Sequence, residues 1–374
     1  MPIFGAQFED LASLAAQNRL RRLIPRAGLD FSSNDYLGLA TSSTLGSAIA
    51  EAVSRGVPLG SGGSRLLRGN HTEHEALEDE AARFFGSESA LFFSSGYAAN
   101  AALLSTLPQR GDLVVHDALV HASAHEGMQL GRSEHRSAIH NDPDSFAEII
   151  TSWRRSGGTG RVWIAVESLY SMDGDQAPLA ALAELAARHD AFLLIDEAHA
   201  TGVFGRDGRG LAAAYEGKEN VITLRTCGKA LGCGGALLCG PLVMRDFLIN
   251  RGRAFIFSTA PSPLLAAGVR AALKLLVAEP ERLVRLRSLI HHASTTLAAH
   301  GAVPTDSQII PIILGGDART MDVAQHLQQA GFDVRGIRPP TVPAGTSRLR
   351  ISLTLNVAPG DVSALGDALA GAMA

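Results

Sequence analysis

Short apolar runs alternate with helical stretches through the central part of the chain. The runs are rich in branched and aliphatic side chains and read as buried strands at 90–95, 112–117, 161–168, 191–200, 221–226 and 235–240. Between several of them the apolar residues recur at helical spacing, as in 179–188. Strands that alternate with helices are typical of a parallel sheet. The sequence therefore predicts an α/β fold with a mostly parallel sheet.

The two ends of the chain follow other patterns. We expect a helix over 11–22, a strand that runs into a loop over 31–39, and a glycine- and serine-rich loop over 56–69. A helix is expected over 74–85, where Thr72 and Glu75 have the spacing of a capping box.

A long helix over 262–278, which Pro280 ends, precedes a stretch of mixed pattern that resembles a smaller α+β domain. The expected division is an N-terminal helical segment (1–38), a large domain (39–275) and a small C-terminal domain (276–374).

Composition narrows the class of protein. The chain has 374 residues, of which 46% are hydrophobic and 19% charged, as in folded globular proteins. The formal net charge of −4 argues against a nucleic-acid surface. No apolar run approaches the roughly 18–20 residues of a membrane span. Because Glu9 and Asp10 also interrupt the start of the chain, we expect no signal peptide and a cytoplasmic location.

The cysteines and lysines are few. Cys227, Cys233 and Cys239 have the spacing neither of a disulfide framework nor of a zinc site, so we interpret them as small buried residues. Lysine occurs only at 218, 229 and 274, whereas Lys and Arg together number 33. Arginine cannot replace an amine that forms a Schiff base, because its guanidinium stays protonated.

Lys229 lies in TCGKALGCGG (226–235), between glycines and directly after an expected strand. Backbone in such a loop can approach a ligand closely. A Walker phosphate loop is excluded, because position 223 is Thr rather than Gly and Ala230 follows the lysine. A solvated loop lysine is the plain alternative. Lys218 lies in an acidic loop and Lys274 in a helix.

Asp196 ends the apolar run of LLIDEAHATG (193–202), and His199 follows three residues later. Parallel sheets bind ligands at the carboxyl ends of their strands, where a buried carboxylate needs a partner. A carboxylate there can keep a pyridine nitrogen protonated, which makes pyridoxal phosphate (PLP) an electron sink. An aspartate at a strand end is also a common turn former.

The segment FFSSGYAAN (92–100) places a Ser-Ser-Gly turn before an alanine-rich helix. Backbone N–H groups at a helix N-terminus suit a phosphate. By contrast, GSGGSRLLRG (60–69) does not fit a dinucleotide fingerprint. His71 with His74, and His121 with His125, lack further ligands at characteristic spacing, so we expect no metal site.

The chain resembles the α-oxoamine synthases in its motifs and in their order, over nearly its whole length. These motifs are SSNDYLGL, GSGGSRLLRGN, SSGYAAN, VHASAHEG, ESLYSMDGD, DEAHATGVFG, TCGKALG, FSTAPSP and RPPTVPAGTSRLRISL. The α-oxoamine synthases are fold-type I PLP-dependent enzymes that condense an amino acid with an acyl-CoA. The resemblance implies a large domain with a mostly parallel sheet and a smaller α+β domain. It also implies a homodimer with shared active sites.

The resemblance also implies site residues. Lys229 matches the Schiff-base lysine, Asp196 the partner of the pyridine nitrogen, and His121 the imidazole that stacks on the ring. Contacts to the phenolic oxygen and the phosphate are implied for His199, Ser171, Gly96, Tyr97, Thr226 and, from the other subunit, Thr259. Substrate-side roles are implied for Asn34, Thr341, Arg19 and Arg350, with Arg350 pairing the amino-acid carboxylate.

The N-terminus departs from the family, because only a short segment separates Arg19 from Phe31, where the family commonly has a strand pair. Arg19, Arg21 and Arg22 are therefore either acyl-chain or CoA contacts or a solvated helix end. Within the family, the run from Ile337 to Arg350 most resembles members that join L-alanine to a pimeloyl group carried by CoA or acyl carrier protein.

Alternatives are glycine or serine with another acyl-CoA, a non-catalytic binding protein of aminotransferase fold, and a nucleotide-dependent oxidoreductase. The oxidoreductase is disfavoured because the glycine fingerprint is missing.

Overall fold

A computed structural model describes residues 3–373 of the chain. It divides into two compact units, one of residues 37–171 and 176–283 and one of residues 3–36, 172–175 and 284–373. The N-terminal segment thus belongs to the same unit as the C-terminal part. The expected boundaries at 38 and 275 stay predictions. None of the helices within the described residues is long and apolar enough to cross a membrane.

The larger unit is built on a seven-stranded sheet in the order β2-β8-β7-β6-β5-β3-β4. Neighbours from β7 to β4 pair in parallel, whereas β8 is antiparallel to both β2 and β7, so β8 alone runs in the opposite direction. The strands are β2 (Ser89–Phe93), β3 (Leu113–Asp117), β4 (Glu134–Ala138), β5 (Val162–Glu167), β6 (Phe192–Asp196), β7 (Val221–Thr226) and β8 (Ala236–Gly240). The mostly parallel α/β sheet expected from the sequence is confirmed.

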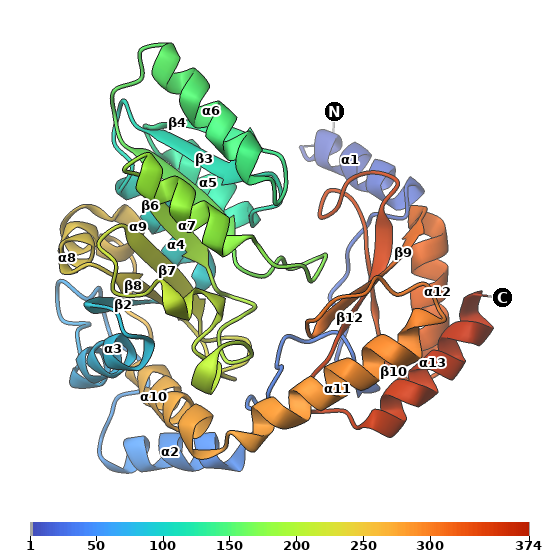
Figure 1. Ribbon diagram of the computed structural model, residues 1–374. Helices are drawn as coiled ribbons and strands as arrows, with labels where there is room; N and C mark the ends of the chain where they lie inside the picture. Colours follow the sequence, from blue (N-terminus) through green and yellow to red (C-terminus); the bar gives the residue numbers. More distant parts are fainter. Residues whose placement is uncertain (1–2, 374) are drawn as a thin grey trace. The chain divides into compact units, whose positions relative to one another are not determined.

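Helices cover both faces of this sheet (Figure 1). Successive side chains of a strand point to opposite faces, so Leu194 joins one apolar core with α4 and α5, while Leu193 and Ile195 join another with α6 and α7. Burial on both faces explains why the strands read as continuous apolar runs. The helices of this unit are α2 (Ser43–Ser54), α3 (Thr72–Phe85), α4 (Gly96–Thr106), α5 (Ala122–Leu130), α6 (Pro143–Arg155), α7 (Leu179–Arg188), α8 (Leu242–Arg251), α9 (Arg253–Ile256) and α10 (Pro263–Ala278), with short 3₁₀ turns at Arg206–Gly208 and Leu211–Ala214.

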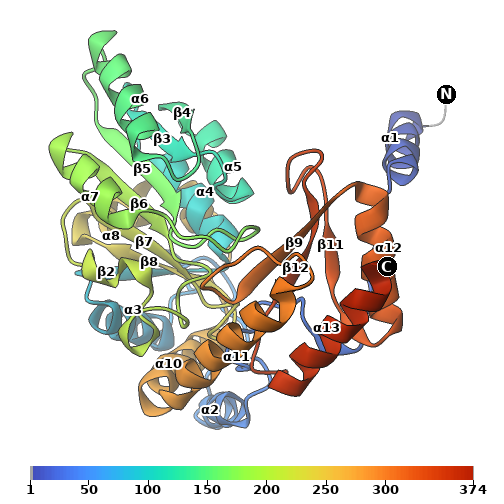
Figure 2. The same ribbon diagram turned by 45° about the vertical axis from the view of Figure 1, so that its right-hand side comes forward.

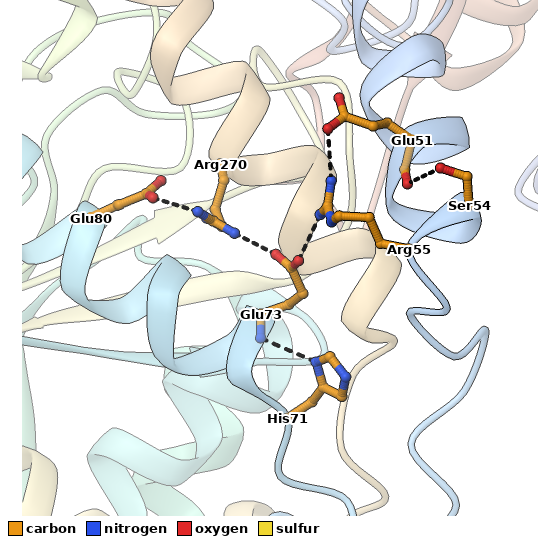
Figure 3. A network of polar contacts seen from close by, with 7 residues as sticks. All are labelled: Glu51, Ser54, Arg55, His71, Glu73, Glu80 and Arg270. Atoms are coloured by element: carbon orange, nitrogen blue, oxygen red, sulfur yellow. Dashed lines mark hydrogen bonds and ion pairs between the residues drawn. The ribbon is translucent and has the colours of Figure 1, made fainter.

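An ionic network joins α2, α3 and α10 (Figure 3). Arg270 of α10 donates to Glu73 (2.5 Å) and Glu80 (2.6 Å) of α3, and Arg55 at the end of α2 donates to Glu73 (2.9 Å) and Glu51 (3.0 Å). Burial disfavours the Glu73 carboxylate, but the hydrogen bonds from the two arginines outweigh burial and lower its pKa. The network therefore joins α10 to two helices, α2 and α3, that lie much earlier in the sequence.

Arg225 of β7 is the centre of a second, fully buried ion cluster. Its guanidinium donates to Glu216 (2.5 Å) and to the carbonyl of Arg209 (2.6 Å), and lies 3.4 Å from Glu197. It also lies 3.9 Å from the centre of the Phe85 ring. Because side chains alternate along a strand, this cluster occupies the face of the sheet opposite to Thr226.

The smaller unit contains a three-stranded antiparallel sheet in the order β11-β12-β9 and a parallel pair of β1 and β10. Helix α12 packs on the three-stranded sheet and α13 packs on α12 (Figure 2). The elements are α1 (Gly5–Ala16), β1 (Leu29–Asp30), β9 (Ile309–Gly315), α12 (Asp317–Gln329), β10 (Phe332–Asp333), β11 (Arg335–Ile337), β12 (Ser347–Ser352) and α13 (Pro359–Met373); α11 (Glu281–Ala298) begins in the larger unit and continues here. This is the smaller α+β part that the sequence predicts.

Three local expectations were wrong. The first helix ends at Ala16 rather than at Arg22, and Asn18 has a left-handed φ of 56°. Residues 31–39 form an irregular segment of bends and a turn instead of a strand. Helix α3 begins earlier than expected, and its capping box is made by His71 and His74, not by Thr72 and Glu75.

Candidate active site

Seven of the nine predicted cofactor residues line one pocket at the carboxyl ends of β5, β6 and β7. The cavity has a volume of about 160 Å³. Its walls are Gly96, Tyr97, Asn100, His121, Ser123, Glu167, Asp196, Ala198, His199, Leu224, Thr226 and Lys229. Parallel sheets characteristically bind ligands at this edge. The structure therefore brings together seven of the residues named from the sequence: Gly96, Tyr97, His121, Asp196, His199, Thr226 and Lys229.

Asp196 is the last residue of β6 and is held by two donors. Its Oδ2 accepts a hydrogen bond from Nδ2 of Asn100 (2.8 Å) and its Oδ1 accepts one from the backbone N–H of Ala198 (2.9 Å). Hydrogen bonds to the charged form stabilise a carboxylate. The geometry thus keeps an oriented anion in the pocket, as a protonated pyridine nitrogen requires.

Lys229 lies in the turn between β7 and β8, and its Nζ is 2.6 Å from Nε2 of His199. A hydrogen bond between two nitrogens needs a lone pair on one of them, so the amine and the imidazole share a proton at this contact. The turn is closed by backbone bonds from Cys227 N–H to the Gly235 carbonyl and from Cys233 N–H to the Cys227 carbonyl, both 2.9 Å. Lys229 is therefore carried by a short, closed loop.

His121 is the N-cap residue of α5. Its Nδ1 accepts from the backbone N–H of Ser123 (3.2 Å) and is 2.8 Å from the Ser123 hydroxyl. Burial lowers the pKa of His121, and Lys229 lowers it further, whereas the Asp196 carboxylate acts in the opposite direction. A neutral imidazole facing the pocket is suited to stack on an aromatic ring. The Tyr97 and His121 rings are 6.3 Å apart and nearly perpendicular.

The N-terminus of α4 lines one part of the pocket. Ser95 caps this helix by accepting from the backbone N–H of Ala98 (3.1 Å). Gly96 opens the helix, and a Cβ at this position would lie 3.7 Å from the Thr226 hydroxyl oxygen. Free backbone N–H groups of the first turn, together with this hydroxyl, form the type of donor set that binds phosphate.

Two predicted cofactor residues are not among those that line this pocket. Ser171 follows β5, and its backbone N–H bonds the Glu167 carboxyl group. Thr259 lies in a separate small cavity with Arg65, Phe92 and Phe255. Their proposed cofactor contacts, including that of Thr259 across a subunit interface, stay predictions.

The predicted substrate residues all lie in the smaller unit. Arg350 of β12 is buried and donates to Oδ1 of Asn34 (3.1 Å) and to the Ser352 hydroxyl (2.6 Å). Thr341 accepts a hydrogen bond from Arg21 (3.1 Å).

The Arg19 guanidinium forms an ion pair with the Asp317 carboxylate (2.7 Å), so this side chain is not simply solvated at a helix end. Asn34 and Arg350 are brought together within this unit, and their substrate roles stay predictions.

Sequence reasoning missed three polar groups of the pocket wall, namely Asn100, Ser123 and Glu167. Asn100 lies inside a motif that was recognised, but a helical asparagine gives no signal until the fold places it beside Asp196. Glu167 ends β5 just as Asp196 ends β6, so the rule that found the aspartate applied to it as well. Among residues 3–373 there is no group of three or more His, Cys, Asp or Glu side chains arranged to hold a metal ion.

The donor set fits PLP. The pocket supplies an anion for a ring nitrogen (Asp196), an amine for the aldehyde carbon (Lys229), a flat imidazole (His121) and the N-terminus of α4 for a phosphate. Each group comes from a different element, and all face the same cavity.

The comparisons with known proteins agree with this arrangement. The family "Aminotransferase class I and II" matches residues 26–366. The 8-amino-7-oxononanoate synthase of Azoarcus sp. (strain BH72) is 41% identical over 96% of this chain and 95% of its own length. The enzyme of the same name from Chromobacterium violaceum is 43% identical over 88% of this chain and 85% of its own length. The serine palmitoyltransferase of S. paucimobilis, solved with a bound PLP–myriocin aldimine, superposes with a TM-score of 0.89 at 26% identity, covering 99% of this chain and 97% of its own.

Proposed function

Because the chain belongs to the class I and II aminotransferase family, we propose that it catalyses the decarboxylative condensation of L-alanine with a pimeloyl thioester. The products are 8-amino-7-oxononanoate, CO₂ and a free thiol, a step of biotin synthesis. The chain is an enzyme of fold type I, and PLP is its cofactor. The observation that carries the chemistry is the amine of Lys229, 2.6 Å from His199, in the same pocket as Asp196.

PLP, when bound, accepts electron density from a carbanion next to the amino-acid nitrogen. Asp196 would hold a proton on the ring nitrogen, because its carboxylate is fixed by Asn100 and Ala198. Lys229 would hold the cofactor at rest. Once released, its amine would take the α-proton of the amino acid, with His199 within hydrogen-bonding distance to share that proton.

His121 would cover one face of the ring. Its pKa is lowered by burial, so it adds no charge to the pocket at neutral pH. Tyr97, Gly96 and Thr226 would bind the phosphate. Arg350 would pair with the amino-acid carboxylate, since guanidinium groups can grip carboxylates with two parallel hydrogen bonds.

The choice of substrates rests on the names of the relatives and on the resemblance of the run from Ile337 to Arg350. Alanine and glycine differ by one methyl group, which is worth about 1–3 kcal/mol in an apolar pocket. We therefore expect a preference for alanine with some turnover of glycine. We also propose a homodimer in which Thr259 reaches the partner's pocket, since Thr259 does not line the pocket of its own chain. The cytoplasmic location stays a prediction.

The test is product analysis by mass. Alanine, glycine and serine are each offered with acetyl, succinyl, pimeloyl and palmitoyl thioesters, on CoA and on acyl carrier protein. The highest kcat/KM is expected for alanine with a pimeloyl thioester. Serine with palmitoyl-CoA is included because a serine palmitoyltransferase has the same fold. If that pair, or glycine with a short thioester, gives the highest value, the biotin assignment is wrong and the PLP chemistry stands.

A further inference from the structure

Glu167 is a second carboxyl group beside Asp196. It ends β5, and it is the direct register partner of Asp196 on the neighbouring parallel strand β6. Neighbouring strands are about 4.8 Å apart, and partners in register point to the same face of the sheet. Both residues line the active-site pocket and also a smaller cavity of about 20 Å³. Two acids therefore share one wall of the site.

The two acids are not equally stabilised. Asp196 accepts hydrogen bonds from a side-chain amide and a backbone N–H. Glu167 is 3% exposed, and its carboxyl group receives the backbone N–H of Ser171. Among residues 3–373, its Oε1 is buried without any hydrogen-bond partner. A buried carboxylate with an unsatisfied oxygen is more costly than a protonated acid in the same place.

The charged and titratable groups that face Glu167 act in both directions. Burial, followed by the Asp196 carboxylate, raises the pKa of Glu167 well above its usual range, and Asp117 of β3 acts in the same direction. The Lys229 amine acts against them. Asp117 itself is 2.8 Å from His140, which offsets part of its charge. His121 and His199 line the same pocket.

We propose that Glu167 is a neutral carboxylic acid in the wall of the active site, and that it limits this wall to a single negative charge, on Asp196. Glu167 is a positioning residue, because it acts through Asp196. The inference rests on the proposed role of Asp196 toward the pyridine nitrogen. A second negative charge on the neighbouring strand would repel the charge on Asp196.

Infrared spectroscopy of the PLP-loaded enzyme at neutral pH tests the protonation state directly. A protonated carboxylic acid has a carbonyl stretch that a carboxylate lacks. Glu167→Gln is expected to remove one such band. Glu80→Gln is the matched control, because Glu80 is paired with Arg270 and its pKa is lowered, so this change should leave the band in place. If Glu167→Gln removes no protonated-acid band, the proposal is overturned.

Two further measurements test the proposal in other ways. In Asp196→Asn the neighbouring charge is removed, so the Glu167 band should disappear at lower pH than in the wild type; an unchanged titration would contradict the proposal. The dissociation constant of PLP for Glu167→Gln should stay within about threefold of the wild-type value, because one neutral group replaces another. A change of more than about tenfold would mean that a charge had been removed.

The outcomes also separate this inference from the proposed function. If the band is found but alanine and pimeloyl thioester are not substrates, the inference stands and the substrate assignment is wrong. If the enzyme makes 8-amino-7-oxononanoate without such a band, only the inference is wrong.

Discussion

His74 should make the stability of the larger unit depend on pH in a defined window. The residue is fully buried in the first turn of α3. Its Nδ1 accepts from the backbone N–H of His71 (3.3 Å), and its Nε2 lies 2.8 Å from the Pro261 carbonyl, to which it can only donate. Both nitrogens are therefore used by the neutral ring, and a proton on Nδ1 would remove the acceptor of the capping box.

Burial, followed by the charge of Arg65, lowers the pKa of His74 from 6.5 to about 4. The unfolded chain thus takes up the proton first as the pH falls. The contribution of the neutral His74 to the free energy of unfolding is complete above about pH 6.5 and is lost between pH 6.5 and 4. Below pH 4 this contribution changes no further. A difference of 2.5 pKa units at 1.36 kcal/mol each corresponds to about 3 kcal/mol.

Urea unfolding at about pH 7.5 and pH 4.5 measures this dependence. His74→Gln keeps an amide N–H for the Pro261 carbonyl but cannot be protonated. Between the two pH values, the free energy of unfolding of the wild type should fall by about 2–3 kcal/mol more than that of the variant. His326→Gln, at an exposed position of α12, should behave like the wild type. Equal losses in the wild type and in His74→Gln would refute the reasoning.

Four other changes test the site and the fold. Lys229→Ala should abolish turnover and borohydride trapping of PLP; trapping on another lysine would contradict the assignment. Asp196→Asn keeps the shape but loses an ionic hydrogen bond of about 1.5–3 kcal/mol, so kcat should fall at least about tenfold, and near-normal kcat would refute its role. Arg225→Met leaves two buried carboxylates without their cation and should lower the free energy of unfolding by about 3–5 kcal/mol in urea titrations, whereas a loss below about 1 kcal/mol would contradict a paired cluster. Mixed dimers of Lys229→Ala and Thr259→Trp should regain activity; no rescue in confirmed heterodimers would argue against shared sites.

The sheet could be predicted from the sequence because its strands are buried on both faces. The helix over Leu179–Arg188 and strand β7 were predicted at the residues that the structure assigns. Strand β4 was missed, because β3 is its only partner among the described strands and most of its side chains are exposed. Polar side chains are usual on such an edge strand, so no apolar run marks it. Pattern reasoning thus found the interior strands and missed the exposed one.

The capping of α3 shows why local motifs can mislead. Thr72 and Glu75 have the right spacing, but the chain enters the helix one residue earlier, and His71 occupies the cap. Histidine is not a usual N-cap residue, and its role here depends on burial of His74 against the Pro261 carbonyl. That contact joins segments 187 positions apart. No rule based on neighbouring residues contains this information.

The site was predictable where a residue was chemically out of place. Lysine is rare in this chain, and a carboxylate after an apolar run is costly unless it has a partner, so Lys229 and Asp196 could be recognised. Asn100 became part of the site only because α4 packs beside the end of β6. The cysteines were correctly interpreted as buried for Cys227 and Cys239, while Cys233 is partly exposed.

The position of β8 next to β2 in the sheet has a consequence for synthesis on the ribosome. Strand β2, which leads into the turn before α4, has β8 as its only neighbour among the described strands of the sheet. Strand β8 follows it by more than a hundred residues. Until β8 has emerged, the hydrogen-bonding edge of an apolar strand is unsatisfied in the nascent chain. Such an edge is a template for aggregation, and contacts so distant in sequence form slowly. Translation pauses or chaperone binding between residues 93 and 236 would therefore affect the yield of folded enzyme more than equal delays after Gly240.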